Sequence, residues 1–457
     1  MINKGVSDLT VGNTRKLIVA FYVPMLMTNM LQQLYNFVDT IIVGKGLGDQ
    51  ALGAVGNMGS LFFLIIGFSM GLSNGFGIMI AQSFGAKDND LLKRNLAVTI
   101  HLSVLITVVL TTLSLIFLPN ALVILNTDSV IMGESLRYGY IIFGGLFSSI
   151  MYNVSSCVLR SLGDSRTPFL AIIASSVINI ILDSFFIFKL HTGVEGAAIA
   201  TIIAQLISAS VCIRKLSTIE MIHLTRKDLK LDLSRWSSLL KNGLPMAFMN
   251  SITAIGCMVI QSFVNDLGVD YTSAYSVCSK YVNLFMTPSS TAGHVMSAFS
   301  GQNYGAGKFR RIREGLRVCL GISLVSYLIF GSSMVFGSYY LASFILKGSG
   351  PIALATSYLP ITGACIIFVD FLFVYRSCVQ GMGYPFVPML SGVAEMALRI
   401  GTVVFLIGRI GFIAVAFAEV SAWTGALIIN MIAFYRILPV EKRTETEHVI
   451  KMKKKYS

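Results

Sequence analysis

The chain has 457 residues, of which 54% are hydrophobic and only 12% are charged, and its mean hydropathy is +0.75. Soluble domains usually carry about 25% charged residues, so this composition argues against a water-soluble enzyme and excludes a disordered protein. The net charge of +13 fits a membrane protein whose cytoplasmic loops carry Lys and Arg better than it fits a nucleic-acid-binding protein.

Long apolar segments follow one another along the whole chain. A helix needs about 20 apolar residues to cross a bilayer, so these segments predict twelve membrane-spanning helices. In chain order the predicted spans are 17–43, 52–80, 96–118, 138–161, 168–190, 194–216, 242–265, 272–298, 317–346, 355–380, 385–408 and 411–437. The apolar runs are continuous, whereas strands of a β-barrel would alternate. We therefore predict an all-α membrane protein.

Lys and Arg are concentrated in alternate connections between these spans. They gather before the first span, near residues 87–94 and 160–166, in the segments 214–241 and 308–317, and after the last span. Because cytoplasmic loops carry the excess of Lys and Arg, we expect both termini in the cytoplasm and a multi-pass protein of the cell membrane.

The two halves of the chain repeat each other at a spacing of about 220 residues. Gln82-Ser-Phe-Gly-Ala86 recurs as Gln302-Asn-Tyr-Gly-Ala306, and Gly163 with Pro168 recurs as Gly383 with Pro388. Each half holds six predicted spans, so both insert the same way up, as in a parallel repeat. The predicted domains are an N-terminal lobe (1–213), a basic cytoplasmic linker (214–241), a C-terminal lobe (242–437) and a basic cytoplasmic tail (438–457). A substrate path is expected in a cleft between the lobes.

Ionisable residues inside the first lobe are the candidates for function, because a charge at the membrane centre is costly. Asp39, Asp183 and Thr201 each lie several residues from the outer ends of their spans, at depths of about 6–10 Å. Asn179 precedes Asp183 by four residues and shares its helix face. We expect these four side chains to share one layer of the lobe.

Two acids in such a pocket have three possible uses. They could carry protons, because burial and a neighbouring like charge both favour the protonated carboxyl group. They could hold Na⁺ through the oxygens of Asp39, Asn179, Asp183 and Thr201, or they could belong to a structural hydrogen-bond network. A structural role rarely requires two acids, so we favour an ion or proton site.

The first span carries further polar residues on the face of Asp39. Gln32, Tyr35 and Asn36 precede Asp39 by seven, four and three residues, so we expect them to line a substrate pocket. Pro24 removes a helix hydrogen bond in the same span and permits a bend there.

The second lobe carries different ionisable residues. Glu395 and Arg399 are four residues apart and predict an ion pair within one helix. Lys280 and Asp370 could pair across helices or act separately. Arg376 lies near a cytoplasmic end, where we expect its side chain to reach toward water.

Several kinds of chemistry have no signature in the sequence. The seven cysteines are scattered without a CxxC pair, and the five histidines lack metal-ligand spacing. No phosphate-binding loop follows the required pattern, and no nucleophile lies in a motif with a base. We therefore expect no enzyme activity, no cofactor, no ATP site and no nucleic-acid partner.

Taken together, these features resemble the multidrug and toxic compound extrusion (MATE) family over essentially the whole chain. The motifs that carry the resemblance are Pro24, Asp39-Thr40, Val43-Gly-Lys-Gly-Leu-Gly48, the Gln82 and Gln302 loops, Arg160-Ser-Leu-Gly-Asp164 with Pro168, and Asn179-Ile-Ile-Leu-Asp183. The resemblance implies two six-helix lobes that form a V around a central cleft. It also implies export of cationic or amphipathic organic compounds in exchange for H⁺ or Na⁺. We expect the protein to be a monomer.

The resemblance also implies roles for particular residues. Asp39, Asn179, Asp183 and Thr201 match the cation or proton site of the family, Pro24 matches its bending position, and Tyr35 and Asn153 resemble pocket-lining positions. Some relatives use an acid in helix seven, but the predicted span 242–265 contains none, which leaves Asp370 as an acid for coupling in the second lobe. The alternative function is a flippase for lipid-linked precursors from the same superfamily.

Overall fold

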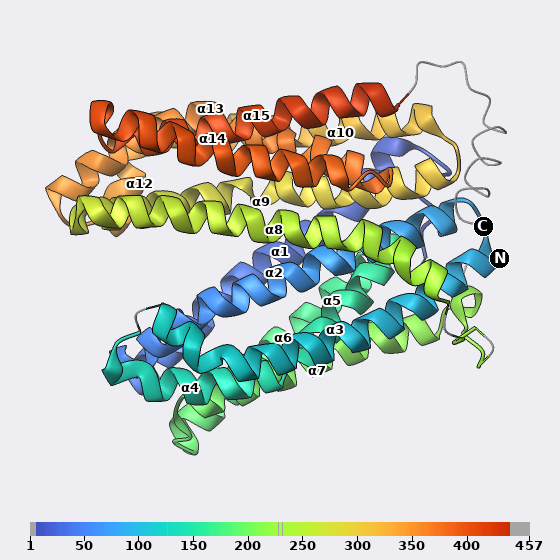
Figure 1. The fold of residues 1–457 in the computed structure, drawn as a ribbon, viewed down its shortest axis with the longest axis horizontal. Coiled ribbons are helices and arrows are strands. Elements are labelled where there is room, and N and C mark those ends of the chain that lie inside the picture. The colour runs from blue at the N-terminus through green and yellow to red at the C-terminus, as the bar shows by residue number, and fades with distance from the viewer. Residues whose placement is uncertain (1–5, 126, 227, 231, 439–457) are drawn as a thin grey trace. The chain divides into compact units, whose positions relative to one another are not determined.

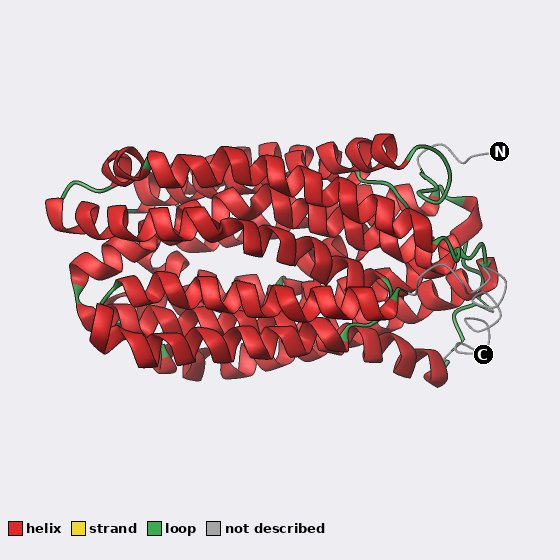
Figure 2. Cartoon of the chain, turned by 90° about the horizontal axis from the view of Figure 1, so that it is seen from above, coloured by secondary structure: helices red, strands yellow, loops and turns green. Residues whose placement is uncertain are grey.

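The computed structural model describes residues 6–125, 127–226, 228–230 and 232–438. In this part of the chain every regular element is a helix, and short loops join the helices (Figure 2). The predicted fold class, an all-α membrane protein, is confirmed. Apart from Leu438, the predicted basic tail lies outside the described residues.

The helices follow one another in chain order as labelled in Figure 1. Those of the first half are α1 (Thr14–Leu47), α2 (Asp49–Gly85), α3 (Asn89–Ile124), α4 (Ser129–Gly144), α5 (Leu146–Ser161), α6 (Arg166–Ser184), η1 (Phe185–Lys189), α7 (Gly193–Ser217) and η2 (Glu220–Ile222). Those of the second half are α8 (Leu233–Leu267), α9 (Val269–Gly305), α10 (Phe309–Ser326), η3 (Tyr327–Gly331), α11 (Ser332–Phe336), α12 (Ser338–Ile345), α13 (Ser349–Gly381), α14 (Phe386–Ile410) and α15 (Ile413–Ile437).

The number of membrane spans agrees with the prediction. Within the described residues, ten helical segments are long and apolar enough to cross a membrane, and the bent pair α4 and α5 raises the count to eleven. Helix α9 is more polar, but its 37 residues would extend over about 55 Å. It contains the predicted span 272–298 and brings the number of predicted spanning helices accounted for to twelve.

The helices extend beyond the predicted spans, because apolar composition marks the membrane core whereas capping fixes the helix end. The Asp88 side chain accepts a hydrogen bond from the backbone N–H of Leu91, so α3 begins seven residues before the predicted span. The fourth span bends by 45° between α4 and α5. At that bend a Cβ on Gly145 would lie 2.3 Å from the Ile202 side chain, so a larger residue would force Ile202 to move.

The described helices belong to two compact units. Unit 1 contains residues up to Asp8 together with Val23–Ala247, and unit 2 contains Leu9–Tyr22 together with the chain from Phe248 onward. The boundaries therefore fall inside α1 and α8, close to Pro24 and Pro245, the prolines inside these two helices. The sequence-based lobes 1–213 and 242–437 place these boundaries elsewhere and stay a prediction.

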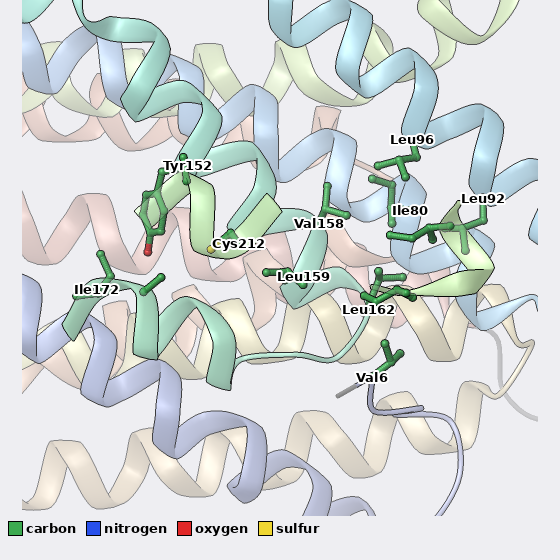
Figure 3. Close-up of a cluster of buried hydrophobic side chains, with 14 residues drawn as sticks. Val6, Ile80, Leu92, Leu96, Tyr152, Val158, Leu159, Leu162, Ile172 and Cys212 are labelled. Atoms are coloured by element: carbon green, nitrogen blue, oxygen red, sulfur yellow. The ribbon is translucent and has the colours of Figure 1, made fainter. Parts of the chain in front are cut away.

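Glycines on α2 explain how the first part of α8 packs within unit 1. A Cβ on Gly71 would lie 2.5 Å from the Cα of Ala247, and one on Gly75 would lie 2.4 Å from the Cα of Gly243. The two backbones thus approach as closely as small residues allow in membrane helices. A separate cluster of buried apolar side chains in unit 1 gathers residues from α2, α3, α5, α6 and α7 (Figure 3).

Candidate ion-coupling site

Unit 1 brings together four of the residues that the sequence singled out. Asp39 on α1 and Asp183 on α6 lie close enough to influence each other electrostatically. Tyr35 lies one turn before Asp39, and its hydroxyl group lies near Thr201 on α7. The Thr201 hydroxyl donates to the carbonyl of Ala197 at 3.0 Å, so its oxygen can accept from Tyr35. Three helices thus converge on one polar site.

The polar atoms of this site are unusual in having no protein partner. Both carboxylate oxygens of Asp183, Oδ1 of Asp39, and the amide nitrogen and oxygen of Asn179 are buried without a hydrogen bond to any described residue. Asn179 and Asp183 are both fully buried. Most buried polar groups in proteins are paired, so these orphan atoms need an explanation. Two acids beside an amide and a hydroxyl group form a donor set that suits a proton or a monovalent cation.

Two further residues belong to the same region but were missed from the sequence. Tyr138 on α4 interacts electrostatically with Asp39, Asp183 and Tyr35. Gln205 lies one turn after Thr201 on α7, and its buried Oε1 has no partner among the described residues. The four-residue spacing from Thr201 was the available signal for Gln205. Nothing in the sequence indicates which face of α4 turns toward Asp39.

The remaining predicted residues of unit 1 lie outside this cluster of contacts. On α1, Gln32 is half-buried and Asn36 is exposed, and on α5 Asn153 is half-buried. Their part in binding substrate stays a prediction. Pro24 is accommodated inside a continuous α1, and the Thr28 hydroxyl donates to the Pro24 carbonyl at 2.8 Å.

Unit 2 contains a buried chain of ion pairs instead. Arg376 on α13 bonds Glu395 on α14, Glu395 pairs with Arg399 at 3.3 Å, and Arg399 pairs with Glu419 on α15 at 2.9 Å. The predicted pair of Glu395 with Arg399 is therefore present. The expectation that Arg376 reaches toward water is wrong: its side chain is buried, because Glu395 on the neighbouring helix neutralises it. Glu419 completes the chain of ion pairs.

The other two candidates of unit 2 are not brought together. Asp370 on α13 is 1% exposed, and its Oδ1 has no partner among the described residues. Lys280 on α9 is exposed, and no ion pair joins it to Asp370 in the described part of the chain. Asp370 is thus a third buried acid with an unpartnered oxygen.

The fold and the site together define a multi-pass membrane protein built from two repeated halves, with unpaired acids buried inside one unit. The MatE family model matches residues 24–185 and matches again over residues 245–405, which confirms the internal duplication. The chain therefore belongs to the MATE family.

Individual relatives agree with this assignment. The chain is 32% identical to the probable multidrug resistance protein YoeA of Bacillus subtilis over 319 residues, which are 68% of each protein. It is 28% identical to the probable multidrug resistance protein YpnP of the same organism over 387 residues, covering 82% of this chain and 84% of the relative. A crystal structure of a MATE protein in complex with MaL6 shares the fold, with a TM-score of 0.86, 22% identity and 99% coverage of both chains.

Proposed function

We propose that this protein is a secondary antiporter of the cell membrane that exports cationic or amphipathic organic compounds in exchange for H⁺ or Na⁺. The observation that carries the proposal is the proximity of Asp39 to Asp183, two acids with buried oxygens that lack partners among the described residues. The relatives named as probable multidrug resistance proteins support the class of substrate.

The coupling step follows from the charges at the site. Two neighbouring carboxylates repel each other, and a proton or a cation between them relieves the repulsion. The amide of Asn179 and the hydroxyl group of Thr201 can then orient towards either ion, since they supply both donors and acceptors. Binding of the ion draws α1, which carries Asp39, toward α6, which carries Asp183. Pro24 is the position at which α1 bends in response.

The available driving force is sufficient for export. One elementary charge crossing a membrane potential of about 100 mV releases about 2.3 kcal/mol. For a compound without net charge, that free energy sustains a concentration ratio of about fiftyfold. A monovalent organic cation exchanged one for one moves no net charge, so its export uses the concentration gradient of H⁺ or Na⁺ instead. No ATP or cofactor is needed in this scheme. The proposed topology places the basic loops and both termini in the cytoplasm, and the proposed active unit is a monomer.

Asp370 is proposed as a second coupling position. It is buried in unit 2 with an unpartnered oxygen, and it takes no part in the chain of ion pairs on α13, α14 and α15. If it couples, Asp370→Asn lowers efflux in the same gradient assay; full efflux by this variant would confine coupling to unit 1.

The test is gradient-driven efflux from proteoliposomes by Asp39→Asn and Asp183→Asn. Each substitution keeps the shape of the side chain but removes the charge, so efflux should fall by roughly a hundredfold with normal insertion. Asp90→Asn, which changes an exposed acid in the first turn of α3, is the matched control. Full efflux by the double variant would overturn the site. Movement of a lipid-linked sugar without movement of organic cations would favour the flippase alternative.

A further inference from the structure

A short helix of eight residues, α12 (Ser338–Ile345), follows α11 within unit 2 and is labelled in Figure 1. One face of this helix packs inward, because Ser338 and Ala342 are both buried and lie four residues apart. The hydroxyl group of Tyr281 on α9 donates to the Leu341 carbonyl at 2.9 Å. The helix is therefore held in a defined orientation within unit 2.

The opposite face of this segment carries aromatic side chains that contact little of the protein. Phe336 at the end of α11 is 86% exposed, Tyr340 is 77% exposed and Phe344 is 86% exposed. The Gly337 N–H donates to the Ser333 carbonyl at 2.8 Å, so helical bonding continues between α11 and α12. The three aromatic residues are four apart and form one stripe, which we name the aromatic stripe (Phe336, Tyr340 and Phe344). Such an open apolar surface usually marks contact with a partner or a membrane.

The length of the preceding helical segment places the start of the stripe at the edge of the membrane. Phe309–Phe336 is one continuous candidate span of 28 residues. Arg317 is its last basic residue, and the helix from Arg317 to Phe336 would extend over about 29 Å. The hydrocarbon core of a bilayer is about 30 Å thick. With Arg317 in one headgroup layer, Phe336 therefore reaches the opposite one.

Helix α12 stays at this level of the membrane. Helices α9 and α10 pack against each other and are joined by a short loop, so depth can be counted along both from that loop. Tyr281 lies about 36 Å of helix from the end of α9, and Phe336 lies about 40 Å from the start of α10. The Tyr281 side chain leans toward the start of its own helix, which covers the remaining few ångströms. Its partner Leu341 therefore lies at nearly the depth of Phe336, although it follows Phe336 by five residues.

The first half of the chain lacks this arrangement. At the repeat spacing of 220 residues, the aromatic stripe corresponds to Ile116, Asn120 and Ile124. Helix α3 runs through all three positions as a single helix. The aromatic stripe thus belongs to unit 2 alone, and the duplicated fold does not require it.

The chemistry of the stripe fits a lipid better than it fits water. Aromatic rings are favoured at the membrane interface, where the ring contacts acyl chains and a hydroxyl group, such as that of Tyr340, reaches the headgroups. Lys347 is exposed three residues after Phe344 and offers a positive charge to a lipid phosphate. We infer that the aromatic stripe binds phospholipids at the membrane interface and anchors α12 there. In the proposed topology this is the outer interface. The inference goes beyond the proposed antiport and does not depend on ion coupling.

The first test measures the depth of the stripe in a bilayer. Trp236 and Trp423 are replaced by Phe, and one tryptophan is introduced as Phe344→Trp or, for the control, as Leu328→Trp. Leu328 is exposed on the same span, about 12 Å deeper than Phe336. In nanodiscs that hold one chain each, phospholipids brominated near the headgroup should quench Phe344→Trp about twofold more than phospholipids brominated near the chain end. The order should reverse for Leu328→Trp.

Two outcomes of this measurement would overturn the inference. A tryptophan at position 344 that neither lipid quenches would show that the stripe lies in water. Quenching that is present with one chain in each nanodisc and disappears with two would show that a second copy of the chain covers the stripe instead of lipid.

The second test compares two triple variants in phospholipid vesicles. One replaces the aromatic stripe by serine, and the matched control places serine at the corresponding positions of the first half: Ile116→Ser, Asn120→Ser and Ile124→Ser. Loss of the stripe should leave the fold intact, because these side chains contact little of the protein, but it should release α12 from the lipid. Hydrogen–deuterium exchange in residues 338–345 should therefore rise about tenfold for the stripe variant and stay unchanged for the control.

The second test can also fail in a recognisable way. Equal exchange in residues 338–345 for the wild type and the stripe variant would contradict the anchor. Wild-type transport without ion coupling would instead refute the proposed antiport and leave the anchor standing, because neither test reads transport.

Discussion

Unit 1 and unit 2 each contain a pair of acids with buried oxygens, and the two pairs are neutralised in opposite ways. In unit 1, Asp39 and Asp183 lie near each other, and no basic side chain pairs with either of them in the described part of the chain. In unit 2, Glu395 and Glu419 are each paired with arginine, so two positive and two negative charges cancel. Duplication thus produced two halves of one fold with different electrostatics.

The difference separates a fixed network from a site open to an ion. A buried charge is tolerated when a partner neutralises it, and removing one partner leaves the other charge uncompensated. The arginines of unit 2 supply this neutralisation permanently. In unit 1 a proton or a cation has to neutralise the acids, and either ion can dissociate again. At the spacing of 220 residues, Arg399 stands in the place of Asn179 and Val403 in the place of Asp183, so the second half lacks the polar pair of the first.

The largest expected effect on stability comes from breaking the network of unit 2. Arg399→Leu leaves Glu395 without one of its two partners and Glu419 without its only described ion pair. We expect the free energy of unfolding to fall by about 3–5 kcal/mol, because buried charges are left unpaired. Thermal unfolding in detergent measures this loss.

A control variant distinguishes the charges from the packing. Replacing Arg376, Glu395, Arg399 and Glu419 together by Met removes every charge of the network. Such replacements are often neutral or stabilising, so stability should return to within about 2 kcal/mol of wild type. A quadruple variant that unfolds as easily as Arg399→Leu would show that the network does more than neutralise its own members.

A smaller effect on stability is expected in unit 1. Asp183→Asn removes one of two repelling acids and breaks no ion pair, so the unfolding free energy should change by less than about 1 kcal/mol or should increase. The same variant should lose gradient-driven efflux. Thermal unfolding and transport measured on one preparation check both statements. A loss of several kcal/mol would indicate that Asp183 has a structural partner.

The smallest effect concerns Gln205. Its buried oxygen lies one turn from Thr201, so Gln205→Leu should weaken ion binding and lower the rate of coupled transport about threefold to tenfold. Rescue by Gln205→Asn would indicate a polar contact rather than packing. Ser210→Ala changes an exposed hydroxyl group on the same helix and serves as the control. Equal rates for Gln205→Leu and Ser210→Ala would remove Gln205 from the site.

Apolar length and helical periodicity predicted much of this arrangement. Twelve apolar runs are enough to place the spans, and four-residue spacing places Asn179 beside Asp183 on one face. Partners on different helices were harder to predict, because packing decides which faces meet. For this reason Tyr138 and Gln205 were missed and the burial of Arg376 was wrong. Pro24 indicated a bend, but the sequence does not show that α1 changes units beside it.

The central claim is that Asp39 and Asp183 exchange a small ion for an exported compound. The most direct measurement records ion flux and efflux of a fluorescent organic cation together in proteoliposomes, with the pH and Na⁺ gradients imposed separately. Wild type should move the cation with one of the two ions in fixed proportion, and the double variant Asp39→Asn with Asp183→Asn should move neither. Stoichiometric exchange by the double variant would contradict the account.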